Sequence, residues 1–296
     1  MIFTDIGMDT ASLAGPLEGK LDAVRRAGFS QVMISAGDVV GHSGGVAAGV
    51  RCVRDSGLTV TGVEALRDFE GCNGRLREYK VDVAKSMLEI CGELGARLLV
   101  VEAATSVHVD AKPDAIVRDL RMLSVLAIPM GIRIAFKGVS RSRTVRNFVA
   151  ASELLYRADC PNLGLALDAF DVLAARIPLD DLDAIDPEQV FLVQLSDYMW
   201  QEMLTPEEQA ATASHFRVFP GEGAHSDGLA AFVSKLDSIG YRGNFSFDVY
   251  NDDFQQMPPD TVVQRARRAA EWLVETVLRR ALPVPNMERL RRTAGT

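Results

Sequence analysis

Short runs of β-branched and other apolar residues alternate along the chain with longer amphipathic segments. Continuous apolar runs of this length are typical of parallel strands that are covered on both faces. Eight runs are predicted to be strands: residues 2–7, 31–35, 58–64, 98–102, 132–137, 163–168, 190–195 and 245–250. Helical periodicity lies between them, over residues 17–27, 76–94, 115–127, 144–157, 229–239 and 259–280.

Eight strand-helix units predict an α/β fold of the (β/α)8 TIM barrel type, as a single domain over residues 1–282. A doubly wound open sheet is the alternative. However, the segment GMDTASLAG that follows the first strand lacks the GxGxxG phosphate loop of that fold. Residues 201–214 look like an extra helix after the seventh strand. The basic tail, residues 283–296, has no helical periodicity, and we favour disorder there over binding to a partner subunit.

Charge and composition exclude several kinds of protein. The net charge of −8, from 40 acidic and 32 basic residues, disfavours a nucleic-acid surface. The N-terminus has no signal-peptide pattern, and the longest apolar segment is too interrupted to span a membrane. Four cysteines without a CxxC spacing indicate free thiols in a reducing compartment. We therefore expect a cytoplasmic protein that binds neither nucleic acid nor membranes.

Ionisable side chains stand where several predicted strands end. Catalytic groups of a TIM barrel lie at the C-terminal ends of its strands. The polar residues at these ends are Glu64, Glu102, Lys137, Asp168, Gln194 and Asp248. Since burying unpaired charge is costly, such a group is normally paired, metal-bound or functional. The sequence therefore predicts a polar site at this end of the barrel.

Six segments in order resemble one family. They are KLDAVRRAGF from residue 20, LRDFEG at 66–71, ALDAF at 166–170, VQLSD at 193–197, FRVFPGEG at 216–223 and FDVYNDDF at 247–254. The chain resembles the xylose-isomerase-like TIM barrels, a group of sugar phosphate isomerases and epimerases. Within that group it is most similar to bacterial 3-dehydroshikimate dehydratases.

The resemblance implies a metal site built from a Glu of the fifth strand, an Asp of the sixth, a Gln or His of the seventh and a Glu of the eighth. Asp168, Gln194 and Asp248 match the last three positions in chemistry, with Asp in place of the final Glu. Lys137 stands where the fifth-strand Glu is expected. An ammonium cannot ligate a cation, whereas nearby carboxylates would stabilise it. We therefore favour no cofactor, with Lys137 in the place of the ion.

The resemblance implies a lyase or isomerase that removes a proton next to a carbonyl of a polyhydroxylated keto acid, sugar or cyclitol. Lys137 would stabilise the enolate oxygen, or form a Schiff base if its pKa is depressed. Asp171, which stands where the family usually has His, or Asp248 would move the proton.

An anionic or polyol small molecule is the expected partner. Arg67 and Arg217 would hold its carboxylate or phosphate by bidentate contacts. Glu102, Gln194 and His225 complete the predicted substrate-binding set. A homo-oligomer is compatible with the resemblance, since family enzymes are commonly oligomeric.

Two alternatives stay open. The loss of the fifth-strand Glu, together with Asp171 in place of His, is also what a catalytically silent barrel would show. Such a barrel would act as a ligand-binding or regulatory subunit. In the other alternative, Glu102 or Glu64 completes a rearranged ligand set with Asp168, Gln194 and Asp248. That set would bind Mn²⁺, Mg²⁺, Co²⁺ or Zn²⁺ for a sugar isomerase or epimerase.

Overall fold

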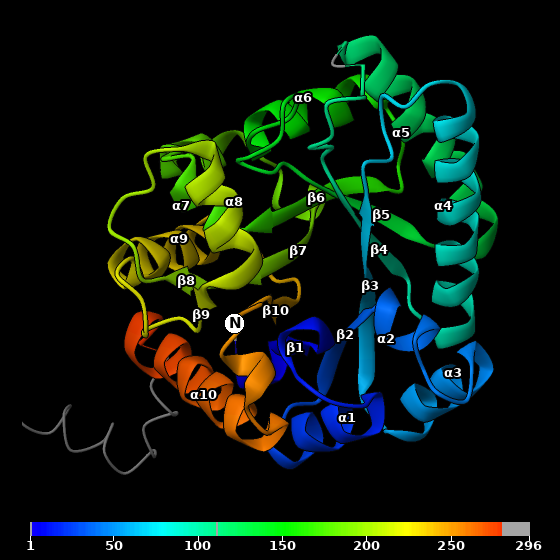
Figure 1. Cartoon of the computed structure of the whole chain (residues 1–296). Helices are drawn as coiled ribbons and strands as arrows, with labels where there is room; N and C mark the ends of the chain where they lie inside the picture. Colours follow the sequence, from blue (N-terminus) through cyan, green and yellow to red (C-terminus); the bar gives the residue numbers. More distant parts are fainter. Residues whose placement is uncertain (1, 111, 280–296) are drawn as a thin grey trace, which may run out of the picture.

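The computed structural model describes residues 2–110 and 112–279 and contains a closed barrel of eight parallel strands (Figure 1). The strands are β1 Ile6–Asp9, β2 Gln31–Ser35, β3 Thr59–Arg67, β4 Leu98–Glu102, β5 Arg133–Lys137, β6 Leu163–Asp168, β7 Val190–Leu195 and β10 Phe245–Phe247. Their order around the barrel is β1-β10-β7-β6-β5-β4-β3-β2. The predicted TIM barrel is confirmed.

Helices form an outer ring around the strands (Figure 1). They are α1 Leu17–Arg26, α2 Ala36–Val40, α3 Val46–Asp55, α4 Gly74–Leu94, α5 Pro113–Ala127, α6 Phe148–Ala158, α7 Ala169–Ala174, α8 Pro206–His215, α9 Ser226–Ser238 and α10 Pro259–Glu271, which a π-helical segment continues over Trp272–Val277. Every residue of β4, β6 and β7 is buried, which explains their continuous apolar runs.

The first strand begins later than the sequence suggests. Residues Phe3–Asp5 form a 3₁₀ turn, and the Asp5 carboxylate accepts a hydrogen bond of 2.7 Å from the backbone N–H of Ile2. The strand therefore starts at Ile6 and ends at Asp9. This shift places the carboxylate of Asp9 at the end of the barrel where catalytic groups gather.

Other boundaries also differ from the prediction, among them the end of β3, which extends to Arg67. The sixth helix begins at Phe148 rather than at residue 144, because the Asn147 side chain caps it by accepting from the N–H of Ala150 at 2.8 Å. The eighth barrel strand ends at Phe247, so Asp248 follows the strand instead of lying within it.

A small hairpin is added beyond β7. Strands β8 Asp197–Tyr198 and β9 Arg217–Val218 pair antiparallel, and the predicted extra helix is α8, which lies between them. Thr205 and Glu208 start α8 with a reciprocal capping box. The hairpin thereby brings Arg217 back to the ends of the barrel strands.

The predicted tail, residues 283–296, lies outside the described residues. Within the described part of the chain, no helix is long and apolar enough to cross a membrane.

Candidate active site

A polar pocket of about 440 Å³ opens at the C-terminal ends of the barrel strands. Its wall contains the charged residues Glu64, Arg67, Glu102, Arg141, Arg217 and Asp248, which come from β3, β4, β9 and the segments after β5 and β10. Glu64, Glu102 and Asp248 were predicted from the strand ends, and Arg67 and Arg217 were predicted to bind the substrate. They are far apart in the sequence, and the barrel brings them to one site.

Lys137, the last residue of β5, lies beneath this wall and is only 1% exposed. Its Nζ donates to Gln194 Oε1 at 2.8 Å and lies 3.0 Å from Glu102 Oε1, 3.4 Å from Asp168 Oδ2 and 3.7 Å from Asp248 Oδ2. Burial disfavours the ammonium, but Glu102, Asp168 and Asp248 outweigh it and raise the pKa of Lys137. Lys137 is therefore a charged group at the centre of the site.

Arg217 is a second buried cation, and it contacts the same two aspartates as Lys137. Its Nη1 lies 2.9 Å from Asp168 Oδ2 and 3.2 Å from Asp248 Oδ2. The guanidinium also stacks 4.6 Å above the ring of Phe170. Burial opposes ionisation of Asp168, but Arg217 and Lys137 hold the pKa of this carboxyl below its usual value. Two carboxylate oxygens are therefore each shared by two cations.

Glu102 stands among three cations. Its Oε1 is 3.0 Å from Lys137 Nζ, and its Oε2 accepts from Arg67 Nε at 2.7 Å. Arg141 Nη2 lies 3.9 Å from the same Oε2. Burial would raise the pKa of Glu102, but Lys137 and Arg67 hold it well below its usual value. This carboxylate is ionised at neutral pH.

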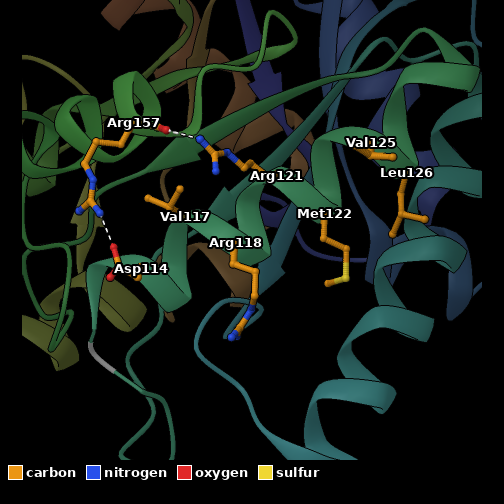
Figure 2. A pocket seen from close by; sticks show the side chains of 8 residues that line it. All are labelled: Asp114, Val117, Arg118, Arg121, Met122, Val125, Leu126 and Arg157. Atoms are coloured by element: carbon orange, nitrogen blue, oxygen red, sulfur yellow. Dashed lines mark hydrogen bonds and ion pairs between the residues drawn. The ribbon is translucent and has the colours of Figure 1, made fainter.

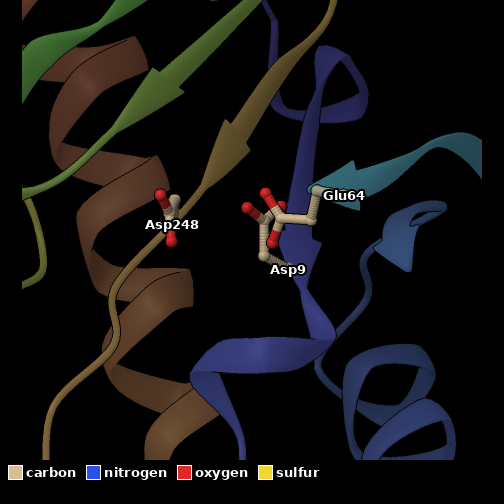
Figure 3. Close-up of side chains that lie close together, drawn as sticks. All are labelled: Asp9, Glu64 and Asp248. Carbon is tan, nitrogen blue, oxygen red and sulfur yellow. The ribbon is translucent and has the colours of Figure 1, made fainter. Parts of the chain in front are cut away.

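Asp9 and Glu64 form a carboxyl pair beside the pocket (Figure 3). Gln194 Nε2 donates to Asp9 Oδ2 at 3.0 Å and to Glu64 Oε2 at 2.7 Å, and Ser246 Oγ contacts Asp9 Oδ1. Burial, reinforced by Asp248, raises the pKa of Glu64 to about 7. Burial and the Glu64 carboxylate also raise the pKa of Asp9 well above its usual value. The pair therefore retains a proton more readily than free carboxyls.

Lys137, Asp168 and Gln194 lie beneath the pocket wall, and two further predicted residues, Asp171 and His225, do not line the pocket either. Asp171 is buried in α7, and its Oδ1 accepts from the backbone N–H and the hydroxyl of Ser140, each at 2.8 Å. His225 stacks on Tyr198 with ring centroids 4.0 Å apart, and its Nε2 lies 2.8 Å from the carbonyl oxygen of Trp200. Asp171 anchors a loop, and His225 supports the hairpin.

The sequence reasoning missed two residues of this site. Asp9 was missed because the first strand was predicted to end at residue 7, two positions too early. Arg141 lines the pocket. The sequence places it in the basic segment RSRTVR at 141–146, whose arginines suit an anionic substrate or helix solvation, but it singles out none of them. The rule that polar residues follow each barrel strand would have found Asp9 with the correct strand end, whereas Arg141 lies in the loop beyond β5, whose end was predicted correctly.

The residues do not fit a divalent cation at the position that the resemblance implies. Gln194 Oε1, Asp168 Oδ2 and Asp248 Oδ2 all lie within 3.7 Å of the Lys137 ammonium, which lies where the ion would have to bind. A second group of oxygens, from Asp9, Glu64 and Asp248, lies within 4.8 Å of one another and is close enough to share an ion (Figure 3). However, the Gln194 amide already donates to two of these carboxylates.

The surroundings of Lys137 also bear on the Schiff-base alternative. A Schiff base needs a neutral amine, which a depressed pKa would provide. Glu102, Asp168 and Asp248 instead raise the pKa of Lys137, and its amine lies beneath the pocket wall. These surroundings favour a charged ammonium and do not support a Schiff base at Lys137.

A larger hollow, of about 630 Å³, lies on the outer surface over α5 and α6 (Figure 2). Apolar side chains such as Val117 and Val125 line it, together with arginines. Its carboxylate, Asp114, is paired with Arg157. Its lining residues come from α5 and α6 rather than from the strand ends, where the catalytic groups of TIM barrels lie.

Comparison with known proteins agrees with this architecture. Residues 21–276 match a family model described as xylose isomerase-like TIM barrel. The 3-dehydroshikimate dehydratase of Pseudomonas aeruginosa is 32% identical over 249 residues, which are 84% of this chain and 38% of that protein. An inosose isomerase of Bacillus subtilis is 27% identical over 208 residues, covering 68% of this chain and 69% of the relative.

Solved structures show the same fold. A xylose isomerase-like TIM barrel/4-hydroxyphenylpyruvate dioxygenase fusion protein superposes with a TM-score of 0.85 at 28% identity, covering 98% of this chain and 44% of that one. An IolI protein with a bound zinc atom has a TM-score of 0.78 at 22% identity, covering 92% of this chain and 98% of that one. This chain spans less than half the length of the Pseudomonas dehydratase and of the fusion protein. The chain belongs to the xylose isomerase-like TIM barrel family.

Proposed function

We propose that the chain is a lyase or isomerase that removes a proton next to a carbonyl of a small polyhydroxylated keto compound, without a divalent metal. Relatives named 3-dehydroshikimate dehydratase and inosose isomerase support this reaction class. One observation supports the proposal that the reaction needs no divalent metal. The Lys137 ammonium lies within 3.7 Å of the amide and carboxylate oxygens that would ligate the ion.

In this proposal the positive charge comes from side chains. A metal ion in such a site stabilises the oxygen of the enolate that forms when the proton leaves. Arg67 and Arg217 line the pocket and can donate hydrogen bonds to that oxygen. Lys137 lies one layer deeper, where it compensates Glu102, Asp168 and Asp248 and thereby holds Arg67 and Arg217 in position. Lys137 is thus a positioning residue.

Glu64 is the best-placed proton acceptor. It lines the pocket, and the structure gives it no ion pair within the described residues, whereas Glu102 and Asp248 are both paired with cations. Asp171 is directed to Ser140 instead. We assign Glu64 the removal of the proton from the carbon beside the carbonyl, in place of Asp171. Asp248 remains the other pocket carboxylate that could move a proton.

The reaction can then end in two ways. For dehydration, the hydroxyl on the adjacent carbon leaves with a proton from the enzyme, so that the substrate loses one water. For isomerisation, the proton returns to a different carbon or to the other face of the same carbon. A 3-dehydroshikimate-like substrate favours dehydration, because loss of water leads towards an aromatic ring.

The test combines turnover with metal content. The purified chain is assayed with 3-dehydroshikimate and with inososes, before and after treatment with a chelator, and its metal is measured by elemental mass spectrometry. We expect turnover of at least one substrate, with less than stoichiometric metal and no loss after chelation. A tightly held stoichiometric metal whose removal abolishes turnover would refute the metal-free proposal. Ligand binding without turnover of any substrate would favour the silent regulatory barrel.

A further inference from the structure

We propose that Arg141 is a specificity-determining residue that binds a carboxylate group of the substrate together with Arg67. This inference rests on the proposed function and deepens it, because it selects keto acids over neutral sugars and cyclitols. Arg141 belongs to the loop after β5, and its side chain lines the pocket.

The hydrogen-bonding capacity of Arg141 is not used within the described structure. Its Nη1 is buried and has no hydrogen-bond partner. Its Nη2 lies 3.9 Å from Glu102 Oε2, which is too long for a hydrogen bond. A buried donor without a partner is unfavourable, and native proteins normally provide one. A planar guanidinium in a pocket wall is well suited to take an oxyanion in two parallel hydrogen bonds.

Arg67 stands on the same side of the pocket and is also partly available. Its Nε is committed to Glu102 Oε2 at 2.7 Å, while its Nη2 reaches Oε1 only at 3.5 Å. The side chain is 66% exposed, so donors of its guanidinium remain open to a ligand. Arg67 of β3 and Arg141 of the loop after β5 thus both approach Glu102 Oε2, and both leave N–H donors on the side of the pocket.

The local charge count also points to an anion. Glu102 carries one negative charge and is surrounded by Lys137, Arg67 and Arg141. The opposite cation, Arg217, is already matched by two aspartates. Three cations therefore surround the one Glu102 carboxylate, and of these Lys137 is shared with Asp168 and Asp248, whereas Arg141 has no other ion pair within the described residues. A carboxylate that binds there would balance the Arg141 charge in a partly desolvated setting, where charge-assisted hydrogen bonds are strong.

The loop that carries Arg141 is fixed on both sides. Ser140 donates to Asp171 Oδ1 through its N–H and its hydroxyl, each at 2.8 Å. Ser142 Oγ donates to the carbonyl of Ala104 at 2.7 Å. This anchoring is the structural role of the buried Asp171 carboxylate. It holds Arg141 in place before the ligand arrives, which lowers the entropic cost of binding.

The test uses two unreactive probes that differ in one group, 3,4-dihydroxybenzoate and its neutral amide 3,4-dihydroxybenzamide. Calorimetric titration measures the affinity of the unmodified chain and of Arg141→Ala, Arg141→Lys and Arg143→Ala. Arg143 is exposed in the same loop and serves as the matched control. Circular dichroism verifies that each variant is folded.

We expect the unmodified chain to bind the acid more tightly than the amide. Arg141→Ala should weaken binding of the acid about 10- to 100-fold, the range typical of charge-assisted hydrogen bonds, and leave the amide unchanged. Arg141→Lys should retain part of the preference, and Arg143→Ala all of it.

Several results would overturn the inference: no binding of the acid, equal affinity for acid and amide, or an equal loss for both in Arg141→Ala. Displacement of the acid by inorganic phosphate alone at lower concentration would assign the subsite to phosphate instead. Because the probes do not react, the outcome is separate from turnover. Arg141-dependent binding in a chain without activity would refute the proposed reaction and leave this inference standing.

Discussion

Lys137 and Glu102 occupy paired positions on the neighbouring strands β5 and β4, and their ammonium nitrogen and carboxylate oxygen lie 3.0 Å apart. The register of β4 and β5 therefore places the Lys137 ammonium directly beside the Glu102 carboxylate, which is its nearest counter-charge. Glu102 in turn fixes Arg67 in the pocket wall. A buried ion pair of the barrel core is thus connected directly to a residue that faces the ligand.

Replacing Lys137 with Met should destabilise the protein by about 3–5 kcal/mol, because Glu102, Asp168 and Asp248 lose a buried counter-charge. Denaturant unfolding followed by circular dichroism measures the change. The control is Lys235→Met, since Lys235 pairs with exposed aspartates on the surface and its replacement should have little effect on stability. Equal effects of the two variants would mean that Lys137 is not the counter-charge of the site.

Restoring a ligand should create metal binding where the ammonium now prevents it. In the double variant Lys137→Glu with Glu102→Gln, the new carboxylate would join Asp168, Gln194 and Asp248 as the fourth oxygen donor around one point. The second substitution removes the Glu102 charge, which would otherwise repel the new carboxylate. Calorimetry with Mn²⁺ should detect one site in the double variant and none at this position in the unmodified chain. Tight Mn²⁺ binding by the unmodified chain would contradict this account.

Replacing Glu64 with Gln should lower kcat/KM about 10²- to 10⁴-fold, the usual contribution of a positioned general base. Burial and Asp248 raise the pKa of Glu64 to about 7, so activity should increase with pH through about 7 as the base ionises. The pH profile of kcat/KM tests this directly. Retention of activity in Glu64→Gln, with the profile unchanged, would shift the assignment to Asp248. Glu188→Gln, at an exposed glutamate, serves as the control.

Glu70 should make stability depend on pH without affecting chemistry. Burial raises the pKa of Glu70 to about 7, with Asp68 and Asp119 adding to the shift, while its usual value in an unfolded chain is near 4.5. Between these two values the folded protein binds more protons than the unfolded one, so its stability decreases as pH rises. Glu70→Gln should weaken this dependence between pH 4.5 and 7. Unfolding free energies measured across that window would show an unchanged slope if the assignment were wrong.

The barrel could be predicted because its signals are local. Runs such as those of β6 and β7 are buried along their whole length, and they are apolar up to the single polar residue at or near the end of each, Asp168 and Gln194. The ends of the elements were harder to predict from the sequence. The starts of β1 and α6 depend on side-chain hydrogen bonds of Asp5 and Asn147, which the apolar pattern does not contain. The predicted strand ends still located three carboxylates of the pocket wall, Glu64, Glu102 and Asp248.

The roles within the site could not be predicted in the same way. Asp171 and Arg141 are both near predicted strand ends, but only the structure shows that one anchors the loop and the other lines the pocket. His225 stands in a family-like segment, yet it stacks on Tyr198. The direction of a side chain is set by packing between elements that are distant in sequence, which no single segment reveals.

Asp168 Oδ2 and Asp248 Oδ2 each face both Lys137 and Arg217. This arrangement has a consequence for how such a protein operates in a cell. These cations are covalent parts of the chain, so they cannot dissociate, exchange or be replaced by a competing ion. Under the proposed function, the enzyme would need no loading step after synthesis. Its activity would then be independent of the metal supply of its surroundings.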